Sequence, residues 1–281
     1  MASALELDTA TTNPAPDFAA IKAKQRQTWA TGDYAVIGTA ILYMAETLCE
    51  AMDLRAGQRV LDVAGGSGNA ALAAARRFCV VTCTDYVPEL LDRGRERAAA
   101  ERLPITFEVA DAEDLPYPDG SFDAVTSTVG VMFAPDQERA AAELLRVCTP
   151  GGTIGLANWT PDGFLGELFR IVGKYAPPPA GVKPAALWGT EERLHELLGE
   201  GVVSLVATRR AFVFRARSAD HWIAMFREYY GPINKAFAAQ DAAGQAALAA
   251  DLDDLLRRHN RATDGTIAAS ADYLEVIATR R

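Results

Sequence analysis

Three aspartates occur in or directly after short apolar segments. Asp62 lies within VLDVAGGSGNA, Asp85 ends CVVTCTD, and Asp111 ends ITFEVAD. A glycine cluster, Ala64–Asn69, follows the first of these segments, and its glycines let the backbone approach a ligand without an intervening Cβ. Carboxylates at three such positions favour a ligand that has hydroxyl or amino donors and positive charge.

Two ligand classes are consistent with the glycine turn. The stretch Gly66–Ala71 fits a GxGxxA dinucleotide fingerprint, which would place a pyrophosphate at a helix N-terminus. Asp62 would then repel the two phosphates from one turn of chain away. S-adenosylmethionine has no phosphate, and its ammonium and sulfonium groups would be attracted to the same carboxylate, directly or through water.

The second and third aspartates help to distinguish these ligands. Asp85 is positioned to accept hydrogen bonds from both ribose hydroxyls, which suits a nicotinamide dinucleotide equally well. Asp111 is positioned to accept from an adenine amino group while the Ala112 amide faces a ring nitrogen. A dinucleotide-binding protein has no comparable need for this third acid, so the pattern favours S-adenosylmethionine.

The elements that position these residues are strands and helices in alternation. Strands are expected at 59–64, 79–85, 105–111, 122–130 and 151–159, at 202–216 with a bend near Arg209 and Arg210, and at 271–280. This alternation predicts an α/β fold with a doubly wound, mostly parallel, seven-stranded sheet. The expected parts are an N-terminal helical cap (1–57), a cofactor-binding core (58–217), a helical insertion (218–270) and the last strand (271–281).

Four segments together resemble the class I S-adenosylmethionine-dependent methyltransferases. These segments are VLDVAGGSGNAAL, CTDYVPELLDRGRERA, ADAEDLPYPDGSFDAVTS and AAAELLRVCTPGGTIGLANW, and they span about residues 55–160 in the family's order. The most similar branch acts on small molecules and includes ubiquinone/menaquinone C-methyltransferase-like proteins. The family's first loop glycine is replaced here by Ala64, so a Rossmann-like fold with one altered loop position is expected.

The resemblance implies S-adenosyl-L-methionine as cofactor and S-adenosyl-L-homocysteine as product. The implied cofactor contacts are Asp62, Ala64, Gly65, Gly66, Asp85, Tyr86, Asp111, Ala112 and Ser127. No metal is implied.

Large rings are concentrated in the segments expected to cover the cofactor. The candidate substrate-pocket residues are Trp29, Tyr34, Met132, Phe133, Trp159, Phe164, Trp188, Trp222, Phe226 and Tyr229. These rings predict an apolar or aromatic small-molecule acceptor. Methyl transfer is an in-line displacement that depends mainly on alignment, so no general base is required. His221, Tyr34 and Tyr229 are weak candidates for one.

Composition excludes several other partners. The net charge of −9 and isoelectric point near 5.0 argue against nucleic acid and an anionic membrane surface. The stretch RGRERAAAER (93–102) alternates acids and bases at helical spacing and is interpreted as a solvated helix face. The chain lacks a secretory leader pattern, and its four cysteines form no CxxC pair, so a cytoplasmic enzyme with buried thiols is expected.

The sequence therefore predicts a small-molecule methyltransferase, with C-methylation slightly favoured over O- or N-methylation. An NAD-dependent oxidoreductase and a non-catalytic binding protein of the same fold remain as alternatives. The identity of the acceptor and the oligomeric state are left open.

Overall fold

A seven-stranded sheet forms the centre of the molecule, in the order β3-β2-β1-β4-β5-β7-β6. The computed structural model describes residues 16–281, so residues 1–15 of the expected N-terminal cap lie outside it. Strands β1 to β5 pair in parallel, whereas β7 runs antiparallel to both β5 and β6. The expected doubly wound, mostly parallel sheet is confirmed. The strands are β1 (Arg59–Val63), β2 (Val80–Asp85), β3 (Ile105–Val109), β4 (Phe122–Thr128), β5 (Cys148–Trp159), β6 (Val202–Ala216) and β7 (Ile267–Arg280).

The chain reverses direction across the sheet between β1 and β4. Strands β2 and β3 follow β1 on one side, and the chain then returns to place β4 on the other side. In open sheets of this kind, ligands bind beyond the carboxyl ends of the strands at this switch point. The fold therefore places the glycine turn after β1 at the expected ligand site.

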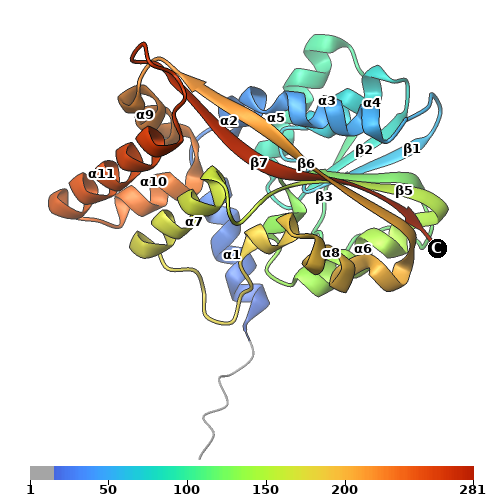
Figure 1. Cartoon of the computed structure of the whole chain (residues 1–281). Helices are drawn as coiled ribbons and strands as arrows, with labels where there is room; N and C mark the ends of the chain where they lie inside the picture. Colours follow the sequence, from blue (N-terminus) through green and yellow to red (C-terminus); the bar gives the residue numbers. More distant parts are fainter. Residues whose placement is uncertain (1–15) are drawn as a thin grey trace, which may run out of the picture.

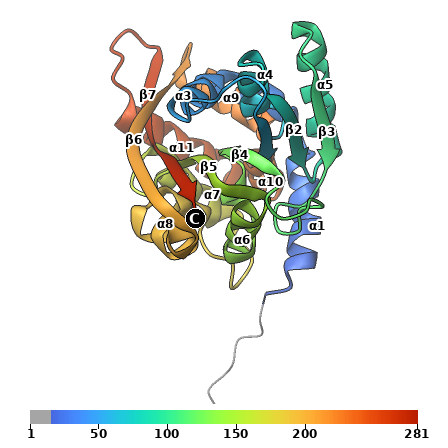
Figure 2. The ribbon, with the colours of Figure 1, turned by 90° about the vertical axis from the view of Figure 1, so that its right-hand side faces the viewer.

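Helices cover both faces of the sheet, with α3, α4 and α5 on one side and α6 and α8 on the other (Figures 1 and 2). Helices α7, α9, α10 and α11 gather at the far end of the long β6–β7 pair, away from the C-terminus (Figure 1). The helices are α1 (Phe18–Trp29), α2 (Tyr34–Ala40), α3 (Leu42–Ala51), α4 (Asn69–Arg76), α5 (Pro88–Glu101), α6 (Gln137–Val147), α7 (Phe164–Tyr175), α8 (Glu191–Leu198), α9 (Ala219–Tyr229), α10 (Gly231–Ala238) and α11 (Ala242–His259).

The alanine-rich helix α4 is enclosed between the sheet and α3. Its residues 70–75 are all buried, and five of these six are alanines. Side chains of this size allow a helix to pack closely on two sides at once, and alanine also has the highest helix propensity. The helix therefore begins directly after the glycine turn and holds that turn against the core.

Three local expectations differ from the structure. The helix expected from residue 34 onward is interrupted at Ile41, whose φ of −102° and ψ of 10° separate α2 from α3. Strand β7 begins at Ile267, four residues before the expected 271. The bend expected in β6 is wrong, because Arg209 and Arg210 pair in register with β7 and their guanidinium groups bind Asp272 and Glu275 there. No helix among residues 16–281 is long and apolar enough to cross a membrane.

Candidate functional site

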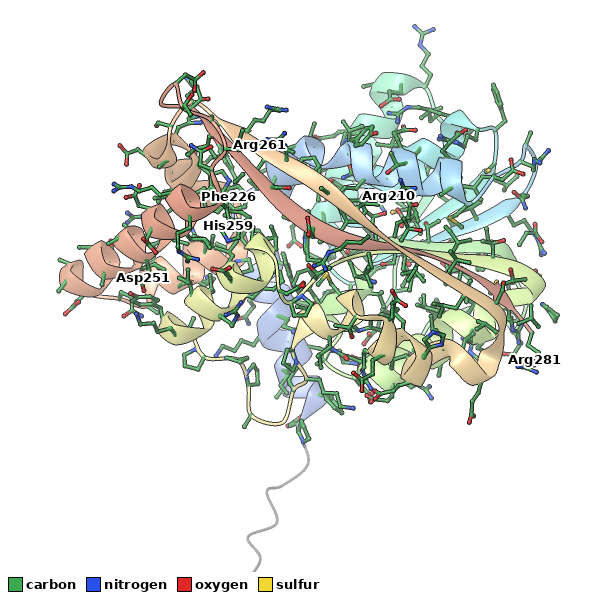
Figure 3. All side chains as sticks on the ribbon, viewed as in Figure 1. Arg210, Phe226, Asp251, His259, Arg261 and Arg281 are labelled. Carbon is green, nitrogen blue, oxygen red and sulfur yellow. The ribbon has the colours of Figure 1, made fainter. Side chains whose placement is uncertain are left out.

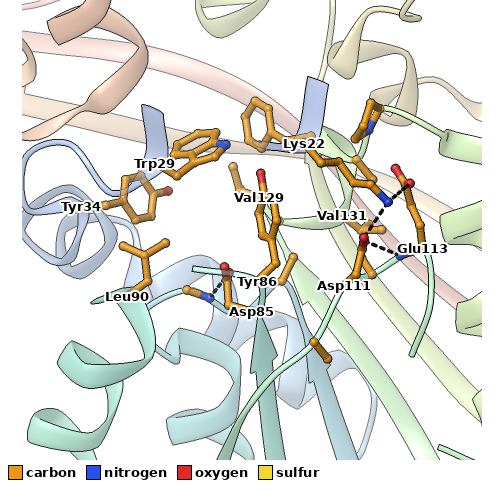
Figure 4. Close-up of a pocket in the computed structure, with 18 residues that line it drawn as sticks. Lys22, Trp29, Tyr34, Asp85, Tyr86, Leu90, Asp111, Glu113, Val129 and Val131 are labelled. Atoms are coloured by element: carbon orange, nitrogen blue, oxygen red, sulfur yellow. Dashed lines mark hydrogen bonds and ion pairs between the residues drawn. The ribbon is translucent and has the colours of Figure 1, made fainter. Parts of the chain in front are cut away.

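A cleft of about 650 Å³ opens at the carboxyl ends of the parallel strands. Helices α1 and α2 supply Lys22, Trp29 and Tyr34 to it, and the strand ends supply Asp85 and Asp111 (Figure 4). Open sheets of this kind bind ligands at this place, beyond the strand ends at the switch point. The cleft is therefore the candidate site.

Asp85 lies at the bottom of the cleft, at the end of β2. Its Oδ2 accepts the Gly66 N–H at 3.0 Å, and its Oδ1 accepts the Val87 N–H at 2.9 Å. Burial raises its pKa to about 6, although the backbone N–H groups act in the opposite direction. Each carboxylate oxygen keeps a second lone pair, so Asp85 can accept two further hydrogen bonds from a ligand.

The N–H groups of the three glycines in the turn are already used within the protein. The amide of Gly65 donates to the Thr84 carbonyl at 2.9 Å, and that of Gly68 donates to the Gly65 carbonyl at 2.8 Å. The Gly66 amide is bound to Asp85. A phosphate-binding turn needs these groups free to point at the anion. This turn lacks that arrangement at all three glycines.

Asp62 lies behind the turn and is only 1% exposed. Its Oδ2 accepts the Ala71 N–H at 2.9 Å, and its Oδ1 accepts the Thr126 hydroxyl at 3.1 Å. Desolvation raises its pKa to about 7, against the effect of these two hydrogen bonds. Asp62 therefore ties β1 to the start of α4 and to β4, and it also borders a smaller chamber of about 350 Å³ behind the turn.

Asp111 forms an ion pair that the sequence did not indicate. The Lys22 ammonium on α1 lies 2.6 Å from Asp111 Oδ2 and 2.7 Å from Glu113 Oε2 (Figure 4). Asp111 Oδ1 accepts the Glu113 N–H at 3.0 Å. Among the described residues that line the cleft, Lys22 is the one with a cationic side chain, and two carboxylates neutralise it.

The turn after β1 and the turn after β4 share an unusual backbone geometry. Ala64 has a φ of +50° and Val129 a φ of +53°, and both line the cleft. Positive φ is uncommon outside glycine and is most strained for a β-branched residue. Gly130 follows Val129, and a Cβ there would lie 2.2 Å from the Ala64 carbonyl oxygen. The two turns therefore pack directly on each other at the centre of the site.

Aromatic rings form the roof of the cleft. Trp29 lies 4.9 Å from Phe133, 5.7 Å from Tyr34 and 5.8 Å from Tyr230 between ring centroids. Burial raises the pKa of Tyr34 to about 12, with a further contribution from the charge of Asp85. The Tyr34 hydroxyl therefore stays protonated at neutral pH and can donate a hydrogen bond.

Most of the expected cofactor residues are brought together. Ala64, Gly66, Asp85, Tyr86, Asp111 and Ala112 line the cleft, and Asp62 and Gly65 line the chamber behind it. Ser127 is placed differently. Its hydroxyl donates to the Val63 carbonyl at 2.7 Å and accepts the Val131 N–H at 2.9 Å. Ser127 therefore links the end of β1 to the turn after β4, and it does not line the cleft.

The expected substrate residues divide into two groups. Trp29, Tyr34 and Phe133 line the cleft. Phe226 borders a separate apolar groove beside β6, while Met132, Trp159, Phe164, Trp188 and Trp222 are buried in the core. Trp159 packs on Phe214 of β6, and Phe164 and Trp222 pack in the helical group at the far end of the β6–β7 pair, where Figure 3 labels Phe226.

The remaining candidate bases are not brought to the cleft. His221 lies at the start of α9, where its Nε2 is 3.1 Å from the Arg217 guanidinium. Tyr229 ends α9, and the following residue, Tyr230, turns its ring toward Trp29 instead. Within residues 16–281, no group of three or more His, Cys, Asp or Glu residues is placed to hold a metal ion.

Comparison with known proteins agrees with this geometry. Residues 61–156 match the family described as a methyltransferase domain. A demethylmenaquinone methyltransferase of Deinococcus radiodurans is 38% identical over 170 residues, which cover 57% of this chain and 69% of that protein. The chain belongs to the class I S-adenosylmethionine-dependent methyltransferase family, in its small-molecule branch. The resemblance expected from the four sequence segments is confirmed.

Other relatives are similar to this chain beyond residues 61–156. An uncharacterised protein of Mycobacterium tuberculosis is 42% identical over 243 residues, covering 85% of this chain and 88% of that protein. A putative methyltransferase from Bacillus halodurans shares the fold with a TM-score of 0.57 at 17% identity, covering 84% of this chain and 97% of that one. Haemonchus contortus phosphoethanolamine N-methyltransferase 2, solved in complex with S-adenosyl-L-methionine, shares it with a TM-score of 0.55 at 18% identity, covering 85% and 53%.

Several residues of the site were missed from the sequence. These are Lys22, Leu90, Glu113, Val129, Gly130 and Val131. Lys22 and Asp111 are 89 positions apart, and no local pattern links them. Val129 and Gly130 are the last two residues of the expected fourth strand (122–130), so their position at a strand end was the one available signal; the observed β4 ends at Thr128.

Proposed function

We propose that this methyltransferase uses S-adenosyl-L-methionine as methyl donor, releases S-adenosyl-L-homocysteine and methylates a small apolar or aromatic metabolite. The observation that carries the choice of cofactor is the state of the glycine turn. Its three glycine amides are bound to protein acceptors, and the cation lining the cleft is paired with two carboxylates. A dinucleotide pyrophosphate would therefore meet acids without a free glycine N–H or an unpaired cation among the described residues that line the cleft, whereas a sulfonium ligand suits the same surroundings.

The residues present fit the adenosine end of this cofactor. Asp85 has lone pairs for the two ribose hydroxyls, and it is held in place by Gly66 and Val87. Asp111 and Ala112 line the next part of the cleft, where they would meet the adenine edge. Lys22 already occupies Asp111 Oδ2, so an adenine amino group would share that oxygen with the ammonium.

We assign the amino-acid end of the cofactor to the chamber behind the turn. Tyr34, Ala64, Gly66 and Val129 line both the chamber and the cleft, so the two spaces adjoin. Asp62 borders the chamber, so its carboxyl group lies at the chamber wall. When bound, the cofactor supplies an electrophilic methyl group, and its position would be at this junction.

The acceptor would lie under the aromatic roof. Trp29, Tyr34 and Phe133 present ring faces and edges to the cleft, a surface that favours a flat or apolar molecule. Alignment of acceptor and methyl can supply about 7–11 kcal/mol of the barrier without a catalytic base. The protonated Tyr34 hydroxyl would orient an acceptor oxygen by donating a hydrogen bond. We favour carbon slightly over oxygen or nitrogen as the methylated atom, following the resemblance to ubiquinone/menaquinone C-methyltransferase-like proteins.

Thermal unfolding with three ligands tests the proposal. S-adenosyl-L-methionine and S-adenosyl-L-homocysteine are each expected to stabilise the protein, by about 2.7 kcal/mol at 100 times the dissociation constant. NAD is expected to leave the midpoint unchanged. A shift with NAD and none with either sulfur nucleotide would support the oxidoreductase alternative, and no shift with any of the three would contradict an intact cofactor site.

A further inference from the structure

Helix α5 contacts α2 and the glycine turn through two arginines. The interpretation of residues 93–102 as a solvated face holds for Arg93, whose side chain is exposed, and is wrong for Arg97, which is partly buried. Arg93 Nη2 lies 3.1 Å from the carboxylate of Asp33, the residue that caps the N-terminus of α2. Arg97 lies one helical turn further along the same face of α5. Its Nη1 donates to the Ser67 carbonyl at 2.7 Å, the Ser67 hydroxyl at 3.1 Å and Asn69 Oδ1 at 2.8 Å.

The side chain of Asn69 connects Arg97 to α2 through two hydrogen bonds. Its side-chain N–H donates to the carbonyl of Gly38 at 2.8 Å while its Oδ1 accepts from Arg97. The backbone of α2 approaches the turn closely, because a Cβ on Gly38 would lie 3.1 Å from the Ser67 hydroxyl and 3.5 Å from the Tyr34 ring. Arg97 therefore binds Asn69, and Asn69 in turn binds the part of α2 that follows Tyr34.

Helix α2 depends on such contacts because it is short. It has seven residues, of which Ile37 and Gly38 are buried. Isolated helices of this length are unstable in water, so their position is set by tertiary contacts. Tyr34 begins this helix and lines both the cleft and the chamber. Whatever fixes α2 also fixes the Tyr34 ring at the junction of the two spaces.

We propose that Arg97 and Asn69 are positioning residues that hold the glycine turn and Tyr34 in register around the amino-acid end of the cofactor. The proposal rests on the proposed function, because it assigns that end to the chamber lined by Ser67 and Asn69. Arg97 touches neither the cleft nor the chamber directly and acts through the two residues that it binds.

The charge of Arg97 supports this assignment. Among residues 16–281, no carboxylate lies within 4.0 Å of its guanidinium, although on the same helix Arg93 has two such partners and Arg95 has one. Burial lowers the pKa of Arg97 from its usual value, while the charge of Glu101 opposes this effect. An unpaired cation behind Ser67 and Asn69 would favour a ligand carboxylate in the chamber, which otherwise has the acid Asp62 on its wall.

Calorimetric binding of two ligands tests the proposal. S-adenosyl-L-homocysteine has the amino-acid chain, whereas 5′-methylthioadenosine has the adenosine and sulfur without it. In Arg97→Met, we expect binding of S-adenosyl-L-homocysteine to weaken about tenfold or more, because hydrogen bonds from a charged donor are lost. Binding of 5′-methylthioadenosine should change less than about twofold in the same variant, since its contacts lie beyond the reach of Arg97.

Two further variants separate positioning from general stability. Arg97→Lys should keep affinity within about threefold of wild type, because all three bonds come from one nitrogen and a lysine ammonium also has three donors. Asn69→Ala should also weaken binding of S-adenosyl-L-homocysteine more than binding of 5′-methylthioadenosine. This variant tests the positioning role if Arg97→Met does not fold. Arg95→Met is the matched control, because Arg95 binds Asp92 and the Phe107 carbonyl on the far side of α5 from α2.

The outcomes are distinguishable. If wild type binds neither ligand, the proposed function fails and the positioning role fails with it. If wild type binds both and Arg97→Met loses both equally, Arg97 merely stabilises the fold and the positioning role is overturned. Unchanged affinity for S-adenosyl-L-homocysteine in a folded Arg97→Met also overturns it.

Discussion

The two halves of the sheet serve different purposes. In the parallel half, strand ends carry Asp62, Asp85 and Asp111, and each carboxylate is bound by backbone or side-chain donors. In the antiparallel half, β6 and β7 extend past the parallel strands toward the helical group, and their contacts there are rings such as Phe214 and Trp222 (Figure 1). The parallel half thus has the chemistry for a polar ligand, and the antiparallel half supplies a rigid apolar support.

This difference predicts that mutations in the two halves have different effects. Changes in the parallel half should act mainly on ligand affinity, and changes in the antiparallel half mainly on the free energy of unfolding. The junction between them is the aromatic group Trp29, Tyr34 and Tyr230, since Phe226 contacts Tyr230 at 5.7 Å between centroids.

The largest effect on stability is expected for Trp222→Ala. Trp222 is fully buried and stacks on Phe226 with centroids 3.8 Å apart. Its removal leaves a large cavity, so urea unfolding should show a loss of about 3–5 kcal/mol. Affinity for S-adenosyl-L-homocysteine should stay within about threefold while the protein is folded. A large loss of affinity with little loss of stability would mean that the two halves are not separate in function.

Asp85→Ala is expected to show the opposite pattern. The variant loses both acceptors for the ribose hydroxyls and also releases the Gly66 N–H, so cofactor affinity should fall by about 30-fold or more in calorimetry. Asp92→Ala is the control, because Asp92 is an exposed acid on α5. Retained affinity in Asp85→Ala would place the cofactor elsewhere, even within the same family.

The sequence predicted the parallel half better than the rest of the site, for a physical reason. A strand followed by an acid or a glycine cluster is a local pattern, and the fold rule for strand ends brings Asp62, Asp85 and Asp111 together without further information. The rest of the site depends on pairs far apart in sequence, such as Lys22 with Asp111 and Arg97 with Asn69. Asp111 and Asn69 lie in recognisable local patterns, but nothing local marks Lys22 or Arg97 as their partners.

The same limit explains the errors in the antiparallel half. Tryptophans were expected in the substrate pocket because large apolar rings occur equally in pockets and in cores. Tyr229 was chosen in place of Tyr230 because the end of α9 sets which of the two rings faces inward, and helix ends are uncertain by a residue or two from sequence.

Lys22→Met tests how helix α1, which carries Trp29 of the roof, is attached to the parallel half. Helix α1 has no fully buried residue, and Lys22 connects it to Asp111 and Glu113 of the parallel half. Without that ion pair, amide hydrogen exchange in α1 should accelerate about tenfold, while exchange in β1 and β4 stays unchanged. Lys24→Met, on the exposed side of the same helix, is the matched control. Equal exchange in both variants would show that the ion pair does not hold the helix and that its other contacts, such as that of Gln25 Nε2 with the Phe133 carbonyl, are sufficient.

A pH effect is expected from the buried acids of the parallel half. Burial raises the pKa of Asp62 to about 7 from its ordinary 3.8, so the folded state binds this proton more tightly than the unfolded state does. The resulting stabilisation is present at low pH and is lost as pH rises toward 7. Between pH 5 and 8, wild type should therefore lose at least about 1 kcal/mol more stability than Asp62→Asn in urea unfolding. Parallel curves for the two proteins would contradict the raised pKa.

The smallest expected effect is at Ala64, which takes the place of a loop glycine in the resemblance drawn from the sequence. Its φ of +50° strains an alanine but not a glycine, so Ala64→Gly should stabilise the protein by about 0.5–1 kcal/mol in urea unfolding. Arg102→Gly is the control, because Arg102 has a φ of +56° at the exposed end of α5, far from the cleft. Both variants should gain similar stability if strain alone is relieved. A loss in Ala64→Gly beside a gain in Arg102→Gly would show that the Ala64 methyl group, which faces Gly130, packs the two turns together.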